Sequence, residues 1–178
     1  THRYPDRAML YATHNCAAYC RFCTRKRKVG DPRTAPTRSD VDAGLGYIAR
    51  TPAIRDVLVS GGDPLSLSND RLRTILETLG AIEHVEVVRL CTRNLVTLPQ
   101  RVDDGLVGLL DALMGDRLTV YVLTHFNHPA ECTAAARRAC ERIARTGTPM
   151  LNQMVLLSGV NDHVETVRTL NSRLLRMR

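Results

Sequence analysis

Five short, β-prone apolar segments alternate along the chain with five longer amphipathic segments. The short segments have the length and composition of buried strands and cover residues 9–13, 56–60, 85–91, 118–124 and 150–157. The long segments have the apolar spacing of helices and cover residues 39–50, 69–79, 103–114, 133–145 and from Asn161 or Asp162 to residue 178. This alternation predicts parallel strands joined by right-handed crossovers, so the expected fold class is α/β.

The chain length limits which α/β architectures are possible. Ser39 is the predicted N-cap of the first helix, and Gly80, Gly115 and Gly147 follow three of the helices. A complete eight-stranded barrel needs about 200 residues or more, so 178 residues predict an open sheet or a partial barrel. A Rossmann-type sheet and a partial barrel both fit the alternation. We expect one domain over residues 1–178, and a fragment, because no signal ends the last helix.

The chemically distinctive residues of the chain follow the predicted strands. They are the segments 16–23, 61–63, 92–93 and 125–128, with Asn152 and Gln153 inside the last predicted strand. In parallel α/β folds, the loops after the strands line the functional mouth. Five separate elements therefore predict one common site at this edge of the sheet.

Cys16, Cys20 and Cys23 place three thiols within eight residues, in the spacing Cys-x3-Cys-x2-Cys. A loop this short can ligate three irons of a [4Fe–4S] cluster, and it leaves the fourth iron without a protein thiolate. A closed zinc site would need a fourth ligand, for which His14 is the only local candidate, and a ferredoxin would need a fourth cysteine. The open iron favours a chelating ligand such as S-adenosylmethionine, bound through its amino and carboxylate groups.

Charge and composition disfavour some classes of protein. The net charge is +7, but the only basic run is residues 25–28, and the chain has no Trp and two Phe, so nucleic-acid binding is not favoured. The isolated cysteines are interpreted as small buried apolar residues: Cys91, Cys132 and Cys140. No apolar run approaches the roughly 18 residues of a membrane span, and no signal peptide is visible, so a cytoplasmic location is expected.

Six motifs together carry a resemblance to a known family. They are His2-Arg3-Tyr4-Pro5-Asp6-Arg7 and the segments 20–27, 60–65, 97–101, 124–129 and 159–162. The set resembles the lysine 2,3-aminomutase family of the radical SAM superfamily, over essentially the whole chain. The resemblance implies a partial parallel (β/α) barrel of the radical SAM type, with about five strand–helix units present. It also implies three cofactors, which are a [4Fe–4S] cluster, S-adenosylmethionine and pyridoxal phosphate.

The resemblance further implies an activity and a set of site residues. The expected reaction moves an amino group from C2 to C3 of an amino acid, with L-lysine as substrate and β-lysine as product. Cys16, Cys20 and Cys23 match the cluster ligands, and the S-adenosylmethionine site is matched by Phe22, Ser60, Gly61, Gly62, Asp63, His125 and Gln153. Arg3, Tyr4 and Arg7 match the residues that bind the pyridoxal phosphate group, and Arg25 matches the arginine that pairs with the substrate carboxylate. No catalytic side chain is expected in this chain, because the cofactor carries the radical.

Alternatives stay open at this point. The substrate could instead be glutamate, arginine or a protein-bound lysine, and a basic zinc or iron–sulfur module that binds RNA is the alternative from another class. An electron donor such as flavodoxin or ferredoxin is the expected partner, with a homo-oligomer as one option for the assembly. The family's lysine that attaches pyridoxal phosphate is expected beyond Arg178, so the isolated chain is expected to be inactive as an aminomutase and poorly stable.

Overall fold

The computed structural model describes residues 1–113, 115 and 118–177. These residues form one sheet with six strands: β1 (His2–Tyr4), β2 (Arg7–Thr13), β3 (Asp56–Gly61), β4 (Val87–Cys91), β5 (Thr119–Thr124) and β6 (Met150–Asn152). The strands lie in sequence order, with β2 to β6 parallel and β1 antiparallel to β2. Each crossover therefore adds the next strand on the same side, as in a barrel, whereas strand order reverses in a Rossmann sheet. The expected partial (β/α) barrel is confirmed, and the Rossmann alternative is wrong.

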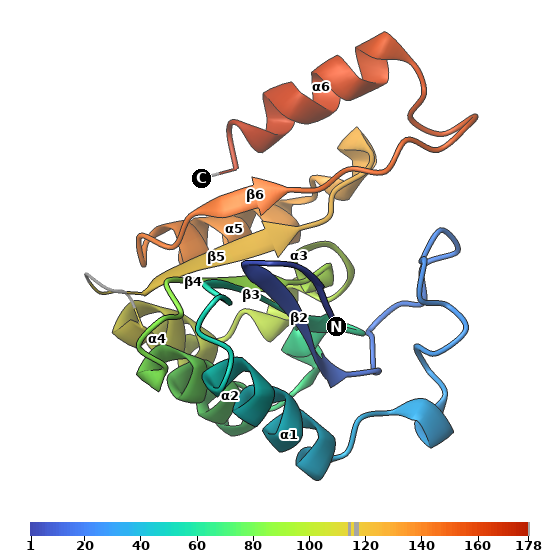
Figure 1. Cartoon of the computed structure of the whole chain (residues 1–178). Coiled ribbons are helices and arrows are strands. Elements are labelled where there is room, and N and C mark those ends of the chain that lie inside the picture. The colour runs from blue at the N-terminus through green and yellow to red at the C-terminus, as the bar shows by residue number, and fades with distance from the viewer. Residues whose placement is uncertain (114, 116–117, 178) are drawn as a thin grey trace.

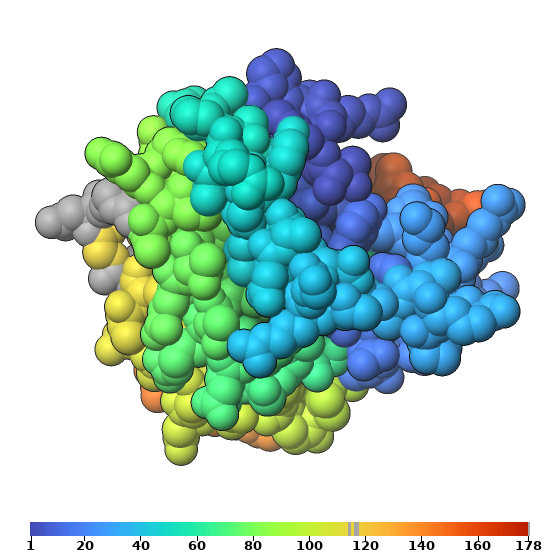
Figure 2. Space-filling model, turned by 60° about the horizontal axis from the view of Figure 1, so that its bottom comes forward, coloured from blue at the N-terminus to red at the C-terminus, as the bar shows by residue number. Residues whose placement is uncertain are grey.

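Helices follow the parallel strands. The α-helices are α1 (Arg38–Ala49), α2 (Asn69–Ala81), α3 (Asn94–Thr97), α4 (Asp104–Leu113), α5 (Ala134–Ala144) and α6 (Val164–Leu174). Short 3-10 helices begin at prolines and span Pro32–Thr34, Pro64–Ser66, Pro99–Arg101 and Pro129–Glu131. Helices α1, α2 and α4 lie together along one face of the sheet (Figure 1), and they close the surface on that side (Figure 2). The segment after β2 projects from the body in both views.

Alternate strand residues build the core. Ala8, Leu10 and Ala12 of β2 are buried, as are Val57 and Val59 of β3, and the same alternation continues through β4 and β5. Because successive side chains of a strand point to opposite faces, these residues belong to the face that the helices cover. The residues between them belong to the opposite face of the sheet.

Several predicted helix boundaries shift because side-chain caps decide them. Thr37, not Ser39, caps α1: its hydroxyl oxygen accepts the Asp40 N–H at 3.2 Å, and the Asp40 carboxylate accepts the Thr37 N–H at 2.8 Å. This reciprocal capping box satisfies the backbone N–H groups of Thr37 and Asp40 at the start of the helix. Helix α2 continues past Gly80, and α3 has no counterpart in the predicted pattern. The predicted helix ends at residues 114 and 178 lie outside the described residues.

The end of the sheet also differs from the prediction. The expected strand over residues 150–157 stops at Asn152, and the side chain of Asn152 binds the backbone of Phe126 through both its oxygen (2.7 Å) and its nitrogen (3.0 Å). Gln153 therefore follows a strand instead of lying within one. Asn161 does not cap the last helix, because its amide donates to the backbone oxygens of Asn127 and Val155, and α6 begins only at Val164.

The first residues of the chain form an unexpected strand. The N-terminal amine of Thr1 donates to the Met9 oxygen at 2.7 Å, and the Met9 N–H donates to the Thr1 oxygen at 2.8 Å. Strand β1 therefore covers the outer edge of β2. Within the described residues, no helix is long and apolar enough to cross a membrane.

Candidate functional site

A cavity of about 360 Å³ lies at the carboxyl ends of the parallel strands. It is lined by every residue predicted for the cluster and for S-adenosylmethionine: Cys16, Cys20, Phe22, Cys23, Ser60, Gly61, Gly62, Asp63, His125 and Gln153. Arg25, predicted for the substrate carboxylate, lines it as well. The loops after β2, β3, β4 and β5 thus meet in one place, as the strand–loop pattern predicts.

Unpartnered polar atoms gather around this cavity. Of the seven buried side-chain nitrogen and oxygen atoms without a hydrogen-bond partner in the described residues, five belong to residues that line it. They are Arg25 Nε, Arg93 Nε, Asn94 Nδ2, Thr124 Oγ1 and His125 Nε2. Since buried polar groups are normally hydrogen-bonded, this concentration indicates a site for polar ligands.

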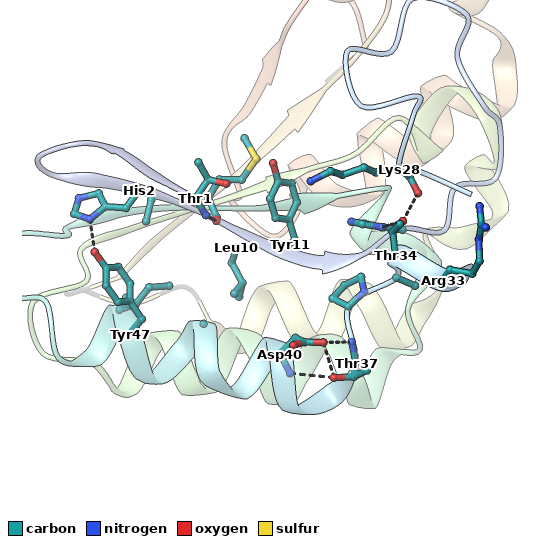
Figure 3. A pocket seen from close by; sticks show the side chains of 17 residues that line it. Thr1, His2, Leu10, Tyr11, Lys28, Arg33, Thr34, Thr37, Asp40 and Tyr47 are labelled. Atoms are coloured by element: carbon teal, nitrogen blue, oxygen red, sulfur yellow. Dashed lines mark hydrogen bonds between the residues drawn. The ribbon is translucent and has the colours of Figure 1, made fainter. Parts of the chain in front are cut away.

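A second cavity, of about 710 Å³, lies between β2, α1 and the segment that leads into α1 (Figure 3). Several of its polar side chains already have partners: Tyr47 hydrogen-bonds His2, Thr37 and Asp40 bind each other, and Thr34 binds the Lys28 carbonyl (Figure 3). None of the unpartnered buried atoms found in the described residues belongs to its lining. The smaller cavity is therefore the better candidate site.

The cysteine loop follows β2 directly and is shaped by short turns. The Cys23 N–H donates to the Cys20 oxygen at 3.0 Å, and the three thiols are free and partly buried. Burial raises the pKa of Cys16 to about 11, with a further contribution from the Asp63 carboxylate. Within the described residues, no three potential ligands converge closely enough to hold a single metal ion. The thiols thus line one wall without forming a closed mononuclear site.

His14 does not join these thiols. Its ring is buried, its Nδ1 lies 3.3 Å from the Thr34 hydroxyl oxygen, and the residue lines the larger cavity. Burial, followed by the charges of Lys28 and Arg25, lowers its pKa. The structure gives no support to His14 as the fourth ligand of a zinc site.

Gly61 and Gly62 allow the end of β3 to touch the cysteine loop. Gly61 has φ +115°, and the Gly62 N–H donates to the Thr13 oxygen at 2.5 Å. A Cβ on Gly61 would collide with the Thr13 oxygen, and one on Gly62 with the Asn15 oxygen. The close approach that these glycines permit is therefore between two backbone segments.

Asp63 forms hydrogen bonds that connect the loops after β2, β3 and β4. Its carboxylate accepts the Leu65 N–H at 3.0 Å, the Thr92 hydroxyl at 2.7 Å and the Arg93 N–H at 2.7 Å. Its own N–H donates to the Asn15 oxygen at 2.8 Å. Burial raises the pKa of Asp63, and the hydrogen bonds oppose that effect. Asp63 therefore shapes the cavity wall.

Arg25 brings a cation into the cavity. Its Nη2 donates to the Ser60 hydroxyl oxygen at 3.1 Å, its Nη1 lies 3.1 Å from the Met9 sulfur, and its guanidinium carbon lies 5.9 Å from the centre of the Tyr11 ring. No ion pair to Arg25 is found within the described residues. A half-buried cation of this kind fits a carboxylate ligand.

Phe22 and His125 join the cysteine loop to the loop after β5. Their rings stack with centroids 5.4 Å apart. Burial, together with the charge of Arg93, lowers the pKa of His125, which disfavours the protonated ring. Gln153 follows β6 and is held by its N–H, which donates to the Thr124 oxygen at 2.9 Å.

Arg93 and Glu131 are the residues whose role the sequence does not reveal. The strand pattern predicts Arg93 at this edge without a role, and it does not single out Glu131. In the structure, Arg93 Nη2 lies 2.6 Å from Glu131 Oε1, and Arg93 Nη1 lies 2.9 Å from the Cys20 sulfur. The available signal is a basic residue directly after one strand and an acidic residue in the loop after the next.

Comparisons with known proteins decide the family. The profile of the Radical SAM superfamily matches residues 10–170. The chain belongs to the radical SAM superfamily. The whole of this radical SAM chain is 44% identical to L-lysine 2,3-aminomutase of Methanococcus maripaludis, 44% identical to glutamate 2,3-aminomutase of Clostridioides difficile and 46% identical to a putative L-lysine 2,3-aminomutase of Aquifex aeolicus. It spans 40%, 41% and 47% of these relatives, respectively. The resemblance to lysine 2,3-aminomutases is thereby confirmed.

Membership of the superfamily implies a [4Fe–4S] cluster and S-adenosylmethionine. The donor set of this radical SAM chain fits both groups. Three thiols from one short loop suit a cluster with one open iron, and the other thiol that lines the cavity, Cys91, comes from the end of β4. His125 and Arg25 line this cavity, and each has a buried nitrogen, Nε2 and Nε respectively, without a hydrogen-bond partner in the described residues.

The residues expected to bind pyridoxal phosphate lie elsewhere in this radical SAM chain. Arg3 and Tyr4 are exposed on β1, and Arg7 begins β2, whereas the cysteines follow its carboxyl end. Arg7 Nε donates to Asp56 Oδ2 at 2.8 Å, and Arg89 Nε binds the same carboxylate at 2.9 Å. None of the three expected residues lines either of the two cavities described above.

Proposed function

We propose that this chain is the cluster- and S-adenosylmethionine-binding part of an amino acid 2,3-aminomutase. The observation that carries the proposal is the single cavity where three cysteines, a half-buried arginine and most of the unpartnered polar atoms meet. The names of the relatives supply the reaction class, which is movement of an amino group between neighbouring carbons. The expected single domain over residues 1–178 and the cytoplasmic location stay predictions.

Different side chains of the cavity would bind the cluster and S-adenosylmethionine. Cys16, Cys20 and Cys23 would ligate the cluster, and Phe22, His125, Gln153 and residues 60–63 would enclose S-adenosylmethionine and exclude water. When bound, the two groups supply the one-electron reductive cleavage that starts radical chemistry. His125 would offer its unpartnered Nε2 as a hydrogen-bonding atom.

Arg25 would hold the carboxylate of the amino acid substrate. Its guanidinium is already oriented by Ser60 and Met9, and its Nε is free to donate. A planar fork of donors suits a carboxylate better than a point charge does, and fixing that carboxylate places the neighbouring carbons at a defined position. L-lysine is the substrate we expect and glutamate the alternative, since relatives with both names are 44% identical to the chain.

Pyridoxal phosphate remains part of the proposal, with Arg3, Tyr4 and Arg7 as phosphate ligands. Two arginines and a phenol suit a dianionic phosphate. In the structure, Arg7 shares the buried carboxylate of Asp56 with Arg89, so a phosphate would have to bind beside that ion pair or replace it. Phosphate-dependent protection of Arg3 and Arg7 from a guanidine-modifying reagent would test the assignment without measuring turnover.

The electron donor that we propose is an acidic carrier such as flavodoxin or ferredoxin. Arg21, Lys26, Arg27 and Lys28 are all exposed beside the cysteine loop. None of them forms an ion pair within the part of the chain that the structure describes. Uncompensated surface charge of one sign steers a partner of the opposite sign and raises its association rate.

Anaerobic reconstitution with iron and sulfide tests the proposed function. We expect a reducible [4Fe–4S] cluster whose EPR spectrum changes when S-adenosylmethionine is added, because the ligand would bind the open iron. A stable zinc protein that binds RNA and assembles no such cluster would contradict the proposal and favour the alternative from the other class.

A further inference from the structure

Arg93 connects a cysteine of the cluster loop to an acidic side chain from a different loop. It follows β4, and its guanidinium donates through Nη1 to the Cys20 sulfur at 2.9 Å and through Nη2 to Glu131 Oε1 at 2.6 Å. The Arg93 and Glu131 side chains are each only 21% exposed. The pair therefore belongs to the cavity wall and is shielded from bulk solvent.

The position of the guanidinium is held from several directions. The Arg93 N–H is bound by Asp63 at 2.7 Å, and the guanidinium carbon lies 5.3 Å from the centre of the Phe22 ring. Glu131 is itself fixed, because its other oxygen accepts the N–H of Asn127 at 2.6 Å and that of His128 at 3.3 Å. The side chain of Arg93 is thus held in an orientation that directs it toward the Cys20 sulfur.

The other two cysteines have different surroundings. Cys23 accepts a neutral backbone N–H, from Arg25, at 3.4 Å. Cys16 lies near the Asp63 carboxylate. Among the three, Cys20 is thus the one for which the described residues show a hydrogen bond from a charged side chain.

We propose that Arg93, held by Glu131, is a positioning residue that raises the reduction potential of the cluster through Cys20. The inference rests on the proposed function, because it requires Cys20 to be a cluster ligand. Reduction adds one electron, and so one negative charge, to the cluster. A cation and an N–H···S hydrogen bond at a ligand sulfur stabilise the reduced form more than the oxidised form. The pair also fixes the ligand loop against the loop that carries His125.

The test compares Arg93→Met, which removes the charge and the donors, with Arg93→Lys, which keeps the charge but cannot bridge both partners. The complete protein is reconstituted anaerobically, its iron and sulfide are counted, and its midpoint potential is measured by EPR-monitored titration. We expect a shift to more negative potential for Arg93→Met and a smaller shift in the same direction for Arg93→Lys. Arg137→Met, which breaks an exposed ion pair with Glu141 on α5, is the matched control and should leave the potential unchanged.

The outcomes separate this inference from the proposed function. A wild-type protein without a [4Fe–4S] signal would contradict both. A normal wild-type cluster, with an unchanged potential in a fully loaded Arg93→Met protein, would overturn the inference alone, even if the variant bound S-adenosylmethionine more weakly. If Arg93→Met assembles no cluster, the midpoint potential of the Arg93→Lys protein is the test. A wild-type midpoint potential in Arg93→Lys would then overturn the inference.

Discussion

The ring of His125 lies flat on the ring of Phe22, with 5.4 Å between the centroids and 10° between the planes. Phe22 stands next to the third cysteine of the loop after β2, and His125 follows β5. The stack therefore joins the first and fourth parallel strands of the sheet at the candidate site. A protonated imidazole is disfavoured in this position, because the ring is partly buried and the positive charge of Arg93 is close.

This environment predicts a pH-dependent stability. The pKa of His125 is lowered in the folded chain, so below the ordinary value of about 6.5 the unfolded chain takes up the proton first. The stabilising effect of the neutral ring is complete above that pH and is lost as the pH falls. Urea unfolding at pH 7.5 and 5.5 should show a larger loss of stability for the wild type than for His125→Gln. Equal losses in the two proteins would contradict the lowered pKa.

Substitution of Gly61 should be far more harmful than substitution of an exposed helix glycine. Gly61→Ala places a Cβ against the Thr13 oxygen at a positive φ, and we expect a loss of about 3 kcal/mol or more in unfolding free energy. A Cβ on Gly108 of α4 would meet no atom of the described residues within 4 Å, so Gly108→Ala should stabilise the chain by about 0.5–1 kcal/mol. Thermal and urea unfolding measure both changes. A well-folded Gly61→Ala protein would show that the backbone approach is not required.

The cluster ligands are testable one at a time. Alanine at Cys16, Cys20 or Cys23 should abolish the visible absorption of the reconstituted cluster and its EPR signal after reduction. Cys91 also lines the cavity, but it ends β4 and lies outside the Cys-x3-Cys-x2-Cys spacing of the loop after β2. Alanine at Cys91 should therefore leave the cluster intact, as should alanine at Cys132 or Cys140. A normal cluster in Cys20→Ala would refute the ligand assignment.

Charge reversal at the exposed basic residues beside the cysteine loop should slow electron transfer from the donor to the cluster. For Lys26→Glu/Arg27→Glu, we expect reduction of the cluster by reduced flavodoxin at low ionic strength to slow roughly tenfold, with a weaker salt dependence. Stopped-flow absorbance measures the rate. Arg138→Glu/Arg145→Glu on and beside α5 is the charge-matched control and should retain the wild-type rate.

A cationic reductant provides the second control for the same experiment. Reduction by the methyl viologen radical cation should not slow in Lys26→Glu/Arg27→Glu, because the changed charges no longer repel it. Slowing with both reductants would mean that the substitutions damage the cluster and not the docking of the donor. Unchanged flavodoxin kinetics would exclude this surface as the docking site.

Two features of this protein can be predicted from local sequence alone, namely the cluster loop and the strand–helix alternation. Cys16, Cys20 and Cys23 are close in the chain, so their spacing alone limits what they can ligate. The apolar pattern of β2 to β5 is likewise local, because each strand must turn alternate residues toward the helices. The rim position of His125 followed from the same rule, since parallel strands end at a common edge.

Which distant side chains share that edge depends on how the strands pack in three dimensions. Arg93 is 73 residues from Cys20 and 38 from Glu131, so their contacts depend on strand order and register, which no local pattern encodes. The same reason explains why Asp63 shapes the cavity wall and why Arg7 is paired with Asp56, 49 residues away. Local spacing placed the cysteines in one loop, whereas packing of the parallel strands brought Arg93 and Glu131 to that loop.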